Sequence, residues 1–197
     1  MSVLDLKRAI VLVAVVLMNT YIALFRGINV GGRNTLPMKE LVVRLEGLGC
    51  EDVRTYIQSG NAVFRHAEKG SSRLAARIST AICESHGFKP DVLLLTTDQL
   101  ENVVASNPFP DAESEPSKLH VLFLAAVPDN PNTDKIEGLR AESERLAVQS
   151  DVVYLHAPDG IGRSRLAAGL EKALGVAGTG RNWRSVNKIL EMAQQWG

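Results

Sequence analysis

Hydrophobic and polar residues along the first half of the chain alternate with two periods, one typical of strands and one of helices. Residues 20–26 (TYIALFR) are β-branched, aromatic and apolar, as in a buried strand. The elements predicted here, in chain order, are a strand at 20–26, a helix from 37 to 48, hairpin strands at 53–58 and 62–65, a helix from 71 to 87 and a strand at 91–96. This β-α-β-β-α-β order is that of a ferredoxin-like fold, which has an antiparallel sheet and both helices on one face.

The second half predicts an incomplete copy of the same pattern. Residues 175–180 are interpreted as a flexible connector, and Trp183 as a core residue of the last helix, which Asn182 caps. The other elements predicted here are a short helix at 97–106, a strand at 119–127, a helix from about 134 that includes Leu146 and Ala147, a strand at 151–156 and a helix that carries Leu166, Leu170 and Leu174. We therefore expect an α+β protein of two ferredoxin-like subdomains, 19–96 and 97–197, with antiparallel sheets and a C-terminal helix.

The first eighteen residues do not fit this pattern. Lys7 and Arg8 precede ten apolar residues, as in a signal peptide, but no small-x-small cleavage site follows them. As a membrane span, residues 9–25 are at the short limit. We interpret 1–18 as an N-terminal extension from an early start codon, with Met18 the true initiator. The alternatives are a membrane anchor and an extra packed element; without an anchor we expect a cytoplasmic protein with no membrane partner.

Composition excludes several classes of protein. The 197 residues include 22 basic and 22 acidic side chains, and this neutral sum argues against a protein that coats nucleic acid through bulk charge. An apolar content of 45% excludes a disordered chain. Two cysteines, Cys50 and Cys83, and four scattered histidines make neither a disulfide framework nor a metal site. No cofactor is expected.

A glycine-rich loop at 27–34 is the first candidate site. Gly27 and Gly32 have the spacing of a Walker A loop, but Arg33 and Asn34 stand where lysine and a hydroxyl residue are required. Consecutive glycines near a helix start, flanked by arginines, favour a simpler anion site. The alternative is that the glycines serve only a tight turn. The candidate ligand-binding residues of this loop are Arg26, Asn29, Gly31, Gly32 and Arg33.

Three further motifs carry candidate ligand-binding residues. At the hairpin tip, Ser59 and Asn61 either bind a ligand or form an ordinary turn. The segments 159–164 and 181–184 place arginine at a helix N-terminus, where the helix dipole disfavours a cation and a bound anion would relieve it. The alternative is purely structural capping. The candidates in these two segments are Arg163, Ser164, Arg181 and Asn182.

Four segments together resemble the bacterial family called domain of unknown function (DUF) 1697. They are YIALFRGINVGGRNTLPM (21–38), YIQSGNAVF (56–64), APDGIGRS (157–164) and TGRNWRSVNKILEM (179–192). The resemblance runs in order over nearly the whole chain and implies a pair of ferredoxin-like subdomains. No activity, cofactor or catalytic residue is established for this family, so the resemblance implies no site residues.

Three functions are compatible with these motifs. The favoured one is a module that binds a phosphorylated or other anionic ligand through the glycine-rich loop and the arginine motifs. The second is an enzyme on such a ligand, with Asp159 as the only acid among the candidate segments 27–34, 59–61, 159–164 and 181–184. The third is a nucleic-acid or protein adaptor, suggested by topology and the basic segment 161–188. All three depend on whether the four motifs meet in space.

Overall fold

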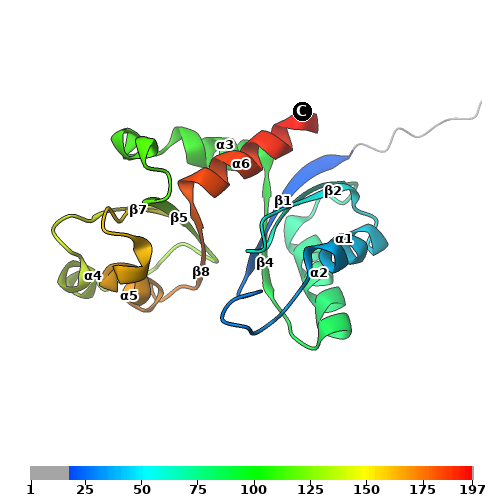
Figure 1. Cartoon of the computed structure of the whole chain (residues 1–197), viewed down its shortest axis with the longest axis horizontal. Coiled ribbons are helices and arrows are strands. Elements are labelled where there is room, and N and C mark those ends of the chain that lie inside the picture. The colour runs from blue at the N-terminus through cyan, green and yellow to red at the C-terminus, as the bar shows by residue number, and fades with distance from the viewer. Residues whose placement is uncertain (1–17, 197) are drawn as a thin grey trace, which may run out of the picture.

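The computed structural model describes residues 18–196, which form two four-stranded antiparallel sheets with six α-helices (Figure 1). The extension expected over 1–18 lies outside this range except for Met18, so its alternatives stay predictions. No helix within 18–196 is both long enough and apolar enough to cross a bilayer.

The first unit has the predicted β-α-β-β-α-β order, with its strands arranged β2-β3-β1-β4. Strand β1 is central, and residues 21–25 are all buried, because both faces of the sheet are covered. Helices α1 and α2 cover one face, where Leu41, Leu45, Leu74 and Ile78 pack. The elements are β1 (Asn19–Arg26), α1 (Met38–Gly47), β2 (Glu51–Tyr56), β3 (Asn61–His66), α2 (Ser71–His86) and β4 (Asp91–Thr96).

The second unit is a complete copy, so the prediction of an incomplete one was wrong. Its strands are arranged β6-β7-β5-β8, which is the same order as in the first unit. The elements are β5 (Leu119–Leu124), α4 (Thr133–Leu139), β6 (Arg145–Gln149), β7 (Val152–His156), α5 (Arg165–Leu174) and β8 (Gly178–Asn182).

Two segments of this unit were wrongly predicted, for different reasons. Leu146 and Ala147 belong to β6, because α4 ends at Leu139 and the chain then pairs with β7. Residues 178–182 form β8 and not a flexible connector. Its glycines conceal the strand, but a Cβ at Gly178 would come within 2.7 Å of Leu122, so the close packing itself requires glycine there.

Two further helices lie across one side of both sheets, at the top in Figure 1, and pack in a core that the sheets share. They are α3 (Thr97–Ala105), opened by a capping box of Thr96 and Gln99, and α6 (Trp183–Ala193). Trp183 is 2% exposed, as predicted for a core residue, and Asn182 accepts a hydrogen bond from the Ser185 N–H at 2.9 Å. Because α3 and α6 pack on both sheets, one shared core joins the units. The boundary expected at residue 96 stays a prediction.

Three short 3₁₀ turns complete the described chain: η1 (Pro110–Ser114), η2 (Ile161–Arg163) and η3 (Gln194–Trp196).

Candidate functional site

A cavity of about 520 Å³ lies where β8, α5 and the β2–β3 hairpin tip meet. Residues from three of the four sequence motifs line it: Ile57 and Ser59, then Ile161, then the end of β8. The complete lining is Ile57, Ser59, His120, Val121, Leu122, Leu155, Ile161, Ala167, Leu170, Gly180, Arg181, Asn182 and Ser185. None of these side chains is acidic. Leucines form one side of the cavity, and hydroxyl, amide and guanidinium groups form the other side.

The glycines of β8 leave room for the cavity. The Cβ positions of Gly178 and Gly180 lie on the same side of β8 and point towards Leu122. Leu122 packs in the layer that α5 covers. Gly178 is packed against Leu122 and Leu124, whereas the Cβ position at Gly180 has Leu122 at 3.7 Å as its nearest neighbour. The strand therefore presents no side chain at residue 180, and the space stays open.

Arg181 is the charged residue of this lining, and it is 8% exposed. Its guanidinium Nε donates to Asn61 Oδ1, and Nη2 donates to the backbone oxygens of Phe25 and Gly60, each at 2.9 Å. All these acceptors are neutral, and no carboxylate of residues 18–196 forms an ion pair with it. Burial lowers the pKa of Arg181 to about 10, so the group stays charged at pH 7.

His120 also lines the cavity, although the sequence analysis did not single it out. Burial lowers its pKa, and a hydrogen bond to the Ser117 backbone opposes that effect only partly. Its Nε2 is buried without a partner among residues 18–196. The available signal was a lone polar residue inside the apolar strand LHVLFL, on the face that also carries Leu122.

The hairpin tip is tightly built. Asn61 is fully buried, and its Nδ2 donates to the backbone oxygen of Tyr56 and to Ser59 Oγ, both at 3.1 Å. Gly60 has a φ of 75°, and a Cβ there would lie 2.8 Å from Phe25 Cβ, so only glycine fits. Asn61 thus holds the tip and binds Arg181, which is a structural role for a predicted ligand-binding residue.

The glycine-rich loop meets the hairpin tip, because Asn29 Nδ2 donates to the backbone oxygen of Gln58 at 2.9 Å. Gly31 and Gly32, with φ of 58° and 73°, form the two-residue turn between Val30 and Arg33. This is the tight turn that the sequence analysis kept as an alternative. Four candidates of this loop do not line the cavity, and their role in ligand binding stays a prediction: Asn29, Gly31, Gly32 and Arg33.

Three other candidates also lie outside the cavity. Arg26 ion-pairs with Glu171 at 2.7 Å and Asp91 at 3.3 Å, and it donates to the Gly178 backbone oxygen, so it ties the two units together. Ser164 caps α5 by accepting from the Ala167 N–H at 2.9 Å. Arg163 is exposed beside it. These three residues stay predictions as ligand contacts.

Asp159, the acid that the enzyme hypothesis requires, also lies outside the 520 Å³ cavity. Asp159 accepts a hydrogen bond from Ser143 Oγ at 2.9 Å and lines a separate hollow next to Arg163. Cys50 is buried and unpaired, and burial raises the pKa of its thiol to about 12, which makes it unreactive. No cluster of three or more potential metal ligands occurs within the described range.

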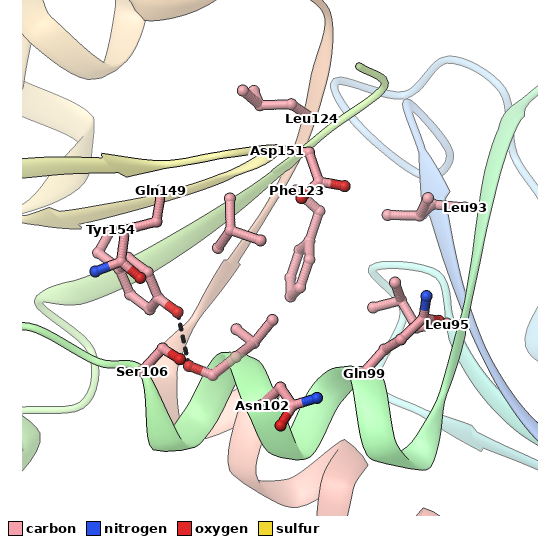
Figure 2. A pocket seen from close by; sticks show the side chains of 12 residues that line it. Leu93, Leu95, Gln99, Asn102, Ser106, Phe123, Leu124, Gln149, Asp151 and Tyr154 are labelled. Carbon is pink, nitrogen blue, oxygen red and sulfur yellow. Dashed lines mark hydrogen bonds between the residues drawn. The ribbon is translucent and has the colours of Figure 1, made fainter. Parts of the chain in front are cut away.

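A second cavity, of about 270 Å³, lies between α3 and the two sheets (Figure 2). Figure 2 shows Phe123 between Leu93 and Leu95 of β4 and Tyr154 of β7. The Tyr154 hydroxyl donates to the Val103 backbone oxygen at 2.7 Å. None of the four sequence motifs contributes to this lining, whereas residues of three motifs line the 520 Å³ cavity, which we take as the candidate site and call the β8 cavity.

Comparisons with known proteins agree with the fold and leave the chemistry open. No curated protein matches the chain. The structure of the conserved bacterial protein SP0830 from Streptococcus pneumoniae is similar, with 25% sequence identity and a TM-score of 0.69 over 90% of this chain and 99% of that chain. The model of the family described as protein of unknown function (DUF1697) matches residues 18–154. The resemblance drawn from the motifs is thus confirmed, and the chain belongs to the DUF1697 family.

Proposed function

We propose that the protein binds a small ligand with an anionic group and an apolar body in the β8 cavity. One observation carries this proposal: Arg181, a buried cation with no carboxylate partner within residues 18–196, lines a cavity whose lining contains no acid. A charge buried without a counter-ion is costly, and an anion in the cavity would offset part of that cost.

The other lining residues match both parts of such a ligand. Ser59, Asn182 and Ser185 supply hydrogen-bonding side chains on the wall formed by β8, the hairpin tip and the start of α6. The positive end of the α6 dipole lies at this wall and adds to the attraction. Leu122, Leu155 and Leu170 form the apolar wall. Sites for small ligands generally combine an apolar lining with a few polar groups in this way.

The geometry favours binding over catalysis by the predicted acid, because Asp159 lies outside the β8 cavity. Our proposal therefore puts the anion at the end of β8 and not at the glycine-rich loop. The two unpaired cysteines support the expectation of a reducing compartment such as the cytoplasm.

A displacement experiment on the full chain tests this proposal. The probe is 8-anilino-1-naphthalenesulfonate, a fluorescent anion with an apolar body, bound at pH 7.5 and displaced by octyl sulfate, octylamine or inorganic phosphate. We expect octyl sulfate to displace it, and the cation and the compact anion to leave it bound. Failure of octyl sulfate to displace the probe would contradict the proposal.

Variants locate the binding. Gly180→Leu fills the β8 cavity and should reduce affinity for the probe at least tenfold. Gly47→Leu is the matched control, because Gly47 is exposed and a Cβ there has no neighbour within 4 Å, but it does not line the cavity. Equal binding by both variants would place the probe elsewhere and overturn the assignment.

A further inference from the structure

Ile57 adopts a backbone conformation that its side chain disfavours. Five non-glycine residues in the described chain have a positive φ, and four of them are Asn, Asp or Ser. The fifth is Ile57, with a φ of 48°. A β-branched residue is strained in the left-handed region, where asparagine and glycine are tolerated.

Packing within the fold does not explain this choice. Ile57 is 51% exposed, so most of the usual benefit of burying an isoleucine is absent. It nevertheless lines the β8 cavity. Strained residues cluster at functional sites, and an outlier of this kind is a reason to look for a function.

A second exposed isoleucine lies at the same cavity. Ile161 follows Gly160, is 38% exposed and also lines the cavity. Because both side chains line the space and still contact solvent, they lie at its mouth. They come from sequence motifs that are about one hundred residues apart, so their meeting is a property of the fold.

We propose that Ile57 and Ile161 bind the apolar part of the ligand, and that this part is an aliphatic chain long enough to reach the mouth of the β8 cavity. The ligand class is then an amphiphile with an anionic head group and an alkyl chain, such as a fatty carboxylate, an alkyl sulfate or an alkyl phosphate. A compact polar anion does not belong to this class. This inference rests on the proposed function and deepens it. The strain at Ile57 is maintained because its side chain acts in binding and not in folding.

The proposal predicts that affinity depends on the length of the ligand's alkyl chain. Each methylene that leaves water on binding should raise affinity about fourfold. Butyl, hexyl, octyl and decyl sulfates are therefore used to displace 8-anilino-1-naphthalenesulfonate from the wild-type full chain. Octyl phosphate and octanoate, measured alongside, separate the contribution of the head group from that of the chain.

Ile57→Asn is the decisive variant, because asparagine suits the left-handed conformation. We expect an unchanged or higher melting temperature, affinity for butyl sulfate within twofold of wild type, and affinity for decyl sulfate at least tenfold lower. Ile161→Asn should show the same loss for the long chain. Val30→Asn is the control, since Val30 is 66% exposed on the adjacent loop but does not line the cavity.

The outcomes separate the two proposals. If no alkyl sulfate binds the wild type, the proposed function falls, and this inference falls with it. If alkyl sulfates bind but Ile57→Asn retains the wild-type dependence on chain length, the inference alone is overturned. A lower melting temperature with a uniform loss for all chain lengths would show that Ile57 acts in folding, which also overturns it.

Discussion

Strands β4 and β8 occupy equivalent places in the two units but differ completely in composition. Each pairs antiparallel with the first strand of its unit and lies at the edge of its sheet. In β4, with the sequence DVLLLT, Leu94 is 6% exposed and packs in the layer below α2. In β8, with the sequence GTGRN, glycines occupy the face towards α5.

The covering helices differ accordingly. The 16-residue α2 packs closely along β4, whereas the 10-residue α5 hardly touches β8. The same topology therefore packs apolar side chains of β4 beneath α2 in one unit and leaves the β8 cavity beside α5 in the other. A strand that gives up apolar packing at one place in a duplicated fold is a reason to expect a ligand there.

Two arginines at the junction of the units extend this comparison. Arg26 is partly exposed and is neutralised by Asp91 and Glu171. Arg181 is buried and contacts only neutral oxygens. Both join the units, but only Arg181 retains a positive charge without a carboxylate partner within the described range.

The largest expected effect comes from replacing these arginines in turn. Arg181→Met leaves buried acceptors of Phe25 and Asn61 without a donor, and we expect it to lower the free energy of unfolding by about 3 kcal/mol. Arg26→Met breaks partly exposed ion pairs and should cost about 1 kcal/mol. Urea denaturation of both variants measures the difference. Equal losses would show that Arg181 is an ordinary interface arginine.

A smaller effect should separate the two glycines of β8. Gly178→Ala forces a Cβ to within 2.7 Å of Leu122, and we expect a loss of about 2 kcal/mol from overpacking. Gly180→Ala has its nearest neighbour at 3.7 Å, so its stability should change by less than about 0.5 kcal/mol. Thermal unfolding measures both. A large loss at Gly180 would mean that the β8 cavity is not open at this residue.

The first unit could be predicted because its signals are local. Strand 20–26, the helix ending near Gly49 and the strand 91–96 each carry enough periodic apolar residues to be recognised alone. Strand β8 could not, because it has five residues, two of them glycine, and its place is fixed by contacts far along the chain. Arg181, for example, donates to Asn61.

The candidate site was predicted only in part, for the same reason. Ser59, Arg181 and Asn182 were named from the sequence, but only tertiary packing brings them to one cavity. The glycine-rich loop looked like an anion site because local geometry suits both an anion and a turn. Its tip forms the turn between Val30 and Arg33, and its role as an anion site stays a prediction. His120 was missed because one polar residue in a strand is a weak signal.

The smallest expected effect concerns the pH dependence of His120. Burial lowers its pKa below the ordinary value of 6.5, so the unfolded chain takes up this proton more readily than the folded one. Stability should therefore fall as the pH decreases from about 6.5 through the lower folded pKa. His120→Gln removes this contribution and should flatten the dependence of the unfolding free energy between pH 7.5 and 5.

His156→Gln is the matched control, because it distinguishes a pH effect in the β8 cavity from a pH effect elsewhere in the second sheet. The pKa of His156 is also lowered, by burial and by Arg145, but this residue does not line the cavity. Octyl sulfate stays anionic at pH 5, and because a bound anion favours the protonated form of His120, octyl sulfate should bind more tightly at pH 5 than at pH 7.5. This gain should vanish in His120→Gln and persist in His156→Gln. Its persistence in both variants would place the bound anion away from His120 and remove that residue from the site.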